Sequence, residues 1–129
     1  MKTIICGSRS LISSGFTFSI VEKAVLASGF KITEVIHGDC RGPDKWSGVW
    51  VWENNIPVKI FPAQWLVNGV KDYEAGFKRN IEMAKNAEAC IAILAFNTKS
   101  HGTRHMISVA KRFNLNLFIY EINTKDNNE

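Results

Sequence analysis

The 129-residue sequence lacks the features that define several protein classes. No apolar run is long enough to span a membrane, and the N-terminus lacks the apolar stretch of a signal peptide. The three cysteines are an odd number without C-x-x-C spacing, which argues against a disulfide framework or a zinc site. His101 and His105 form an i, i+4 pair, but no H-E-x-x-H motif is present. We therefore expect a soluble, cytoplasmic protein without a metal or a cofactor.

The sequence also has no block of consecutive basic residues, although its formal net charge is +4. The charge alone is therefore weak support for a nucleic-acid partner, which we rank below a small phosphorylated ligand. The arginines are placed unevenly, because Arg9, Arg41, Arg79 and Arg104 lie in polar or glycine-containing segments, whereas the lysines are spread along the chain. This placement is typical of a site for a multiply charged anion, since the guanidinium fork matches phosphate geometry.

Short apolar segments alternate with helical patterns along the chain. Strands are predicted near residues 3–6, 32–36, 56–61, 89–96 and 115–122, with helices near 17–28, 43–54, 71–86 and 100–113 and a loop over 62–70. Helical crossovers between successive strands imply parallel pairing. The fold class is therefore α/β: a single Rossmann-like three-layer domain over residues 1–122, with a parallel sheet of about five strands and helices on both faces. A polar tail follows at residues 123–129.

The first predicted strand ends in Gly7-Ser8-Arg9. Gly7 lets a ligand approach the main chain closely. Ser8 supplies a hydroxyl, and Arg9 supplies a cation suited to phosphate. Ligands of open parallel sheets bind just beyond the carboxyl ends of the strands. We interpret these residues as one wall of a site for a phosphorylated ligand, and a tight turn with a surface arginine is the alternative.

Two further loops fit the same kind of site. The second strand leads into a loop bracketed by Gly38 and Gly42, in which Arg41 lies and after which Asp44 suits the positive end of a helix dipole. The last helix opens with Ser100-His101-Gly102-Thr103, where free backbone amides and a hydroxyl can hold phosphate. The alternative for this segment is a plain Ser or Thr cap.

Two helical segments allow two interpretations each. Helical spacing places Arg79 and Asn80 on the same side as Gly76, either facing a ligand or in tight packing with Arg79 bonded to loop carbonyls. The helix near 43–54 carries Trp46, Trp50 and Trp52, so it is apolar around most of its girth. Such a helix is either buried in the core or forms a homo-oligomer interface.

The order of these motifs resembles the YspA-type (cpYpsA-related) branch of the SLOG superfamily. The matching series is Gly7-Ser8-Arg9, Gly38-x-x-Arg41-Gly42-x-Asp44, Ala63-x-Trp65, Ala75-Gly76-x-x-Arg79-Asn80-x-x-Met83 and Ser100-x-Gly102-Thr103-x-x-Met106. The resemblance implies a Rossmann-like fold related to LOG-type nucleotide hydrolases and Smf/DprA proteins. It also implies ligand-binding positions at Gly7, Ser8, Arg9, Gly38, Arg41, Gly42, Asp44, Arg79, Asn80, Ser100, Gly102 and Thr103.

The sequence departs from the LOG enzymes at their glutamate position, which is occupied here by Met106. We therefore expect binding of a nucleotide-derived phosphorylated ligand, such as ADP-ribose or a nucleoside phosphate, by a sensor, carrier or sequestering homo-oligomer. A nucleotide phosphoribohydrolase or N-glycosidic hydrolase is the alternative, with Asp44 as the candidate base, although a helix cap is the commoner role of Asp at that position. A nucleic-acid-binding module ranks third.

Overall fold

The computed structural model describes residues 1–8, 14–38, 50, 54–96 and 99–122. Along the chain these residues form β1 (Lys2–Gly7), α1 (Ser14–Ser28), β2 (Glu34–His37), β3 (Val58–Ile60), β4 (Leu66–Val67), β5 (Val70–Lys71), α3 (Ala75–Lys85), β6 (Ala89–Ala95), α4 (His101–Arg112) and β7 (Asn116–Ile122). Within this part of the chain, no helix is long and apolar enough to cross a bilayer.

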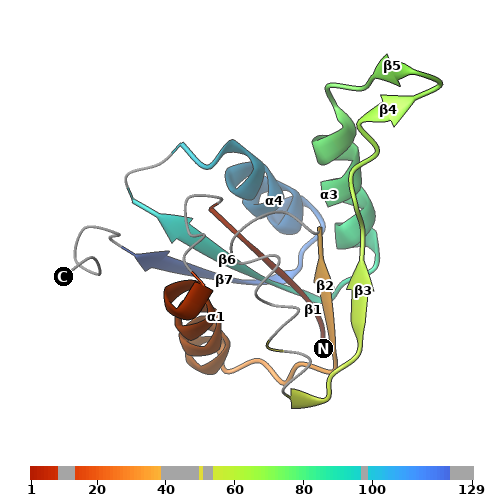
Figure 1. Ribbon diagram of the computed structural model, residues 1–129. Coiled ribbons are helices and arrows are strands. Elements are labelled where there is room, and N and C mark those ends of the chain that lie inside the picture. Colours follow the sequence, from red (N-terminus) through yellow and green to blue (C-terminus); the bar gives the residue numbers. More distant parts are fainter. Residues whose placement is uncertain (9–13, 39–49, 51–53, 97–98, 123–129) are drawn as a thin grey trace.

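Five strands form one parallel sheet in the order β3-β2-β1-β6-β7 (Figure 1). The central strand β1 pairs with β2 on one side and with β6 on the other, so Ile4 lies opposite both Ile36 and Cys90. The strand order reverses between β1 and β6, which makes that junction the switch point of the sheet. The predicted single α/β Rossmann-like domain is confirmed.

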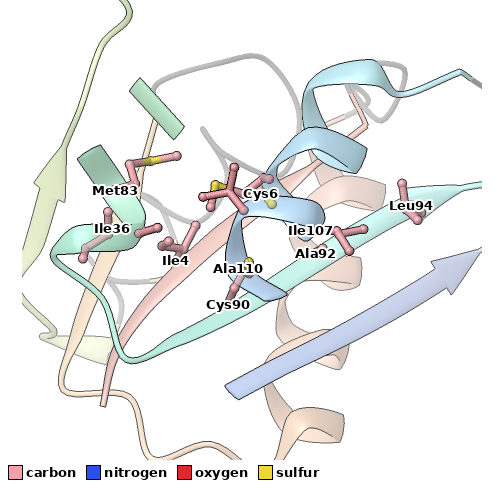
Figure 2. Close-up of a cluster of buried hydrophobic side chains, with 12 residues drawn as sticks. Ile4, Cys6, Ile36, Met83, Cys90, Ala92, Leu94, Ile107 and Ala110 are labelled. Carbon is pink, nitrogen blue, oxygen red and sulfur yellow. The ribbon is translucent and has the colours of Figure 1, made fainter. Parts of the chain in front are cut away.

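Apolar side chains cover both faces of the sheet. On one face, Ile5 and Ile91 pack against α1 and against Trp50, which is only 8% exposed. On the other face, Ile4 and Cys90 pack against α3 and α4, through residues such as Met83 and Ala110 (Figure 2). All seven residues of β6 are buried, as its uninterrupted apolar sequence predicts. The two clusters fix the helices over the sheet and thereby position the loops at its edges.

The segment expected to be a loop contains a β-hairpin instead. Strands β4 and β5 pair in antiparallel register, with Leu66 opposite Lys71 and Val67 opposite Val70. Asn68 and Gly69 form the two-residue turn with φ angles of 53° and 78°. Two positive φ angles match the twist of a tight hairpin, and Asn-Gly is the sequence that adopts them most readily. The prediction of a loop over 62–70 is wrong for this reason.

Helix α3 begins later than its sequence pattern predicts. Val70 and Lys71 are taken up by β5, and the Asp72 carboxylate then accepts a hydrogen bond of 2.9 Å from the Glu74 amide. This local turn leads into the helix at Ala75. Most of the predicted helix near 43–54 lies outside the described residues, including Trp46 and Trp52. Trp50 belongs to the monomer core, so the core interpretation holds for that residue.

Candidate functional site

The candidate site lies at the carboxyl edge of the parallel sheet, beside the switch point. Ser8 follows β1, Gly38 follows β2, and Ser100 precedes α4. Because parallel strands all end at one edge, the fold brings these three separate segments to the same side of the domain. The sheet order places the end of β1 between the ends of β2 and β6.

Three hydrogen bonds hold Ser8 at the carboxyl edge of the sheet. Its amide donates to the Ile93 carbonyl at 3.0 Å, and its hydroxyl accepts from the Ala95 amide at 3.0 Å. The Ser8 and Ser100 hydroxyl oxygens lie 2.5 Å apart and share a hydrogen bond. Ser8 is 1% exposed and Ser100 is half-buried, so this contact between distant segments is partly shielded from solvent. The end of β1 is therefore tied to both β6 and the start of α4.

Ser100 occupies the N-cap position of α4 but does not cap it with its side chain. Its backbone is left-handed, with φ 47° and ψ 47°, and its hydroxyl turns to Ser8. The backbone carbonyl of Ser100 accepts the Arg104 amide at 2.9 Å. Among the described residues, none lies within 4 Å of a Cβ built at Gly102, so no described side chain fills the space beside the first turn. The plain Ser100 cap is thus absent, and the first-turn amides keep the donor character that favours an anion.

Arg79 of α3 reaches across to the end of β2. Its Nη1 donates to the Gly38 carbonyl at 2.9 Å, and its Nε donates to Asn80 Oδ1 at 3.1 Å. A Cβ built at Gly38 would lie 2.8 Å from Arg79 Cζ, so any larger residue there would push the guanidinium aside. Of the two interpretations of Arg79, the structure shows the hydrogen bond to a loop carbonyl. It places the cation at the sheet edge.

Asn80 links Arg79 to α4. Because Arg79 Nε only donates, Oδ1 of Asn80 must be the acceptor, and this fixes the orientation of the amide. The Nδ2 group lies 3.3 Å from the Gly102 carbonyl and 3.0 Å from His105 Nδ1. Asn80 is 4% exposed, so these contacts are sheltered. A continuous polar chain therefore runs from the end of β2 through α3 to the first turn of α4.

His105 belongs to this polar chain, although it was not among the predicted site residues. Its Nδ1 accepts from Asn80, so the neutral ring carries its proton on Nε2. The ring stacks on Phe77, with the centroids 4.1 Å apart. Burial, with a smaller contribution from the Arg112 cation, lowers the pKa of His105. Its spacing from His101 was the available sequence signal, but nothing in the sequence indicated Asn80 as its partner.

Gly76 serves packing between α3 and the segment before the hairpin. A Cβ built at Gly76 would lie 3.4 Å from Cη2 of Trp65, which is ordinary van der Waals contact. The Trp65 indole therefore rests against the start of α3, where Gly76 leaves the backbone uncovered. Trp65 thus packs against Gly76, although an alanine methyl group would also fit at this distance.

The predicted site residues divide into three groups. The structure brings together Ser8, Gly38, Arg79, Asn80, Ser100 and Gly102 through the contacts above. Gly7 is the last residue of β1, paired with Ile93, and Thr103 is buried in the first turn of α4. The remaining predicted positions lie outside the described residues: Arg9, Arg41, Gly42 and Asp44, the candidate base.

Comparison with known proteins adds no relative to this picture. A scan against models of known protein families finds no match to the chain. A search of curated proteins finds no match either. The described residues contain no group of three or more His, Cys, Asp or Glu side chains placed to hold a metal ion.

Proposed function

We propose that this protein binds a nucleotide-derived phosphorylated ligand at the carboxyl edge of its sheet, as a cytoplasmic sensor, carrier or sequestering protein. The observation that carries the proposal is the contact between the Ser8 and Ser100 hydroxyls at the switch point. It joins the end of β1 to the start of α4, where open parallel sheets bind their ligands. We expect the ligand to belong to the ADP-ribose or nucleoside phosphate class.

Three features of the edge support a phosphate group there. Within the described part of the chain, the Ser100 side chain does not cap the first-turn amides of α4, and no residue lies within 4 Å of a Cβ at Gly102. The Arg79 guanidinium is held at the end of β2 by the Gly38 carbonyl and by Asn80. Amides at a helix N-terminus and a preorganised guanidinium are both suited to phosphate oxygens.

The proposal is tested by calorimetric titration with ADP-ribose, NAD, nucleoside mono- and triphosphates and cyclic nucleotides. We expect one class to bind, and a ligand at a hundred times its Kd to stabilise the fold by about 2.7 kcal/mol. Arg79→Lys keeps the charge but loses the planar fork, so it should weaken binding about tenfold or more. The matched control Lys85→Ala removes a cation at the far end of the same helix and should bind normally.

Two results would contradict the proposal. One is the failure of every nucleotide in the panel to bind the folded wild-type protein. The other is equal affinity of wild type and Arg79→Lys, because the cation at the sheet edge would then play no part. Chromatography of the titrated mixtures distinguishes binding from turnover, since hydrolysis of an N-glycosidic bond releases free base. We also propose, independently of the ligand, that the protein is a homo-oligomer.

A further inference from the structure

The β4–β5 hairpin and its neighbours expose more large apolar side chains than any other part of the described chain. We call this set the apolar arm, and it consists of Trp65, Leu66, Val67, Val70, Tyr73 and Phe77, which are 43%, 69%, 47%, 69%, 79% and 50% exposed. Figure 1 shows the hairpin projecting from the body of the domain beyond the start of α3. Exposed apolar surface of this extent marks interaction sites in soluble proteins.

The arm is anchored to the domain at its base. The Asp72 amide donates to the Trp65 carbonyl at 2.7 Å, and the Trp65 indole rests on Gly76 of α3. The two strands themselves have only two residues each. An isolated two-stranded hairpin is marginally stable in water and gains stability when its apolar side chains are covered. Because the base of the hairpin is fixed to α3 and its tip is exposed, the hairpin is suited to contact another molecule.

Three of the four charged side chains near the arm contact other groups of the chain, and Glu74 is exposed. The Asp72 carboxylate lies 2.8 Å from Lys78 Nζ, and this ion pair lowers the pKa of Asp72. The Lys71 ammonium lies over the Tyr73 ring, 5.0 Å from its centroid. The arm therefore presents an apolar surface without a net charge of either sign. Such a surface is complementary to another apolar surface, and a second copy of the same arm provides one.

The exposed apolar area of the arm is spread over both faces of the hairpin. The six residues expose roughly 500 Å² in all, taking about 200 Å² for a whole aromatic side chain and about 100 Å² for a whole Val or Leu. Val67 and Val70 pair on one face, whereas Leu66 pairs with Lys71 on the other. A standard interface buries about 800 Å² on each partner, of which roughly 65% is apolar in homodimers. The arm therefore supplies the apolar core of a small twofold interface when both faces of each hairpin are covered in the dimer.

We propose that the apolar arms of two copies pack against each other about a twofold axis and make this protein a homodimer. The same patch then lies on both sides of the contact, as an isologous interface requires. Trp50 takes no part, because it is buried in the monomer core. The proposal gives a surface to the oligomer proposed above and does not depend on the ligand. A monomeric protein that still binds nucleotide would therefore overturn this inference alone.

The test is sedimentation velocity across a concentration series, on wild type and on the double variant Val67→Lys, Val70→Lys. We expect a dimer for wild type and a rise in the dimer Kd of about 100-fold or more for the variant, because two cations would enter an apolar contact. Circular dichroism confirms that the variant is folded. The matched control Leu26→Lys changes a leucine on α1 that is 76% exposed, and it should remain dimeric.

Salt and lipid separate the remaining outcomes. Raising the NaCl concentration should leave an apolar dimer intact, whereas dissociation in salt would contradict the apolar contact. A wild-type protein that is monomeric at all concentrations overturns the proposal, and cosedimentation of that monomer with phosphatidylcholine vesicles would assign the arm to a lipid surface. A dimer that survives the double substitution places the interface elsewhere and also overturns it.

Discussion

At the scale of single residues, the two serines of the edge differ in what they support. Ser8 provides the hydroxyl that accepts the buried Ala95 amide, whereas the Ser100 hydroxyl is held by Ser8 at the open end of α4. One is therefore expected to matter for folding, and the other chiefly for the ligand. Substituting the two residues separately distinguishes these roles.

We predict that Ser8→Ala lowers the free energy of unfolding by about 1–3 kcal/mol, because a buried amide loses its acceptor. Ser100→Gly should change it by less than about 1 kcal/mol, since glycine relieves the positive φ while the shared hydrogen bond is lost. Urea unfolding of both variants measures these differences. Equal destabilisation by the two substitutions would contradict the assignment.

His105 predicts a pH dependence of stability. Burial and the Arg112 cation lower the pKa of His105 below the ordinary 6.5. The Asn80 amide donates a hydrogen bond to Nδ1 of the neutral ring. The unfolded chain then takes up a proton before the folded chain does, so stability falls as the pH drops below about 6.5 and the loss is complete below the folded pKa. Above that window the contribution of His105 is constant.

The measurement is urea unfolding at about pH 7.5 and about pH 5.5, on either side of the ordinary histidine value. We expect His105→Gln to reduce the loss of stability on acidification. The control His101→Gln changes the exposed histidine one turn earlier and should keep the wild-type dependence. A wild-type slope in His105→Gln would show that other groups cause it.

At the scale of elements, the two helix-start glycines serve different purposes. Gly76 is covered by Trp65, whereas a side chain at Gly102 would meet none of the described residues and would lie beside the proposed phosphate position. Alanine stabilises a helix more than glycine does. The contacts at both positions leave room for a methyl group. The two glycines therefore predict similar effects on stability and different effects on binding.

We predict that Gly76→Ala and Gly102→Ala each raise the free energy of unfolding by about 0.5–1 kcal/mol. Only Gly102→Ala should also weaken nucleotide binding, because its methyl group occupies the space next to the first-turn amides. Urea unfolding and calorimetric titration of both variants give the comparison. Equal nucleotide affinity of the two variants would remove Gly102 from the site.

The same scale shows what sequence reasoning could reach. Helical crossovers between short apolar segments predicted a parallel sheet, and the glycines at the end of β1 and just after β2 indicated its carboxyl edge. The β4–β5 hairpin escaped because its strands are too short for alternation to show, although Asn68-Gly69 was a usable signal. The contact between Asn80 and His105 depends on how α3 packs on α4, which helical periodicity within either segment does not specify.

At the scale of the whole molecule, stability depends on the two apolar layers that flank the sheet. Ile91 is fully buried between β1 and β7, whereas Leu26 is mostly exposed on α1. We predict that Ile91→Ala costs about 2–5 kcal/mol of unfolding free energy through loss of burial and a residual cavity. Leu26→Ala should change it by less than about 0.5 kcal/mol. Similar costs for both, measured by urea unfolding, would contradict the assignment of the core.

The central claim is that a phosphorylated nucleotide binds at the carboxyl edge of the sheet. The most direct measurement is an NMR titration of the ¹⁵N-labelled protein with ADP-ribose and a nucleoside monophosphate. The account predicts amide shift changes concentrated at Ser8, Gly38 and Gly102, with little change at Lys85. Shift changes confined to the groove between α4 and β7, around Ser108 and Glu121, or no changes at all, would contradict it.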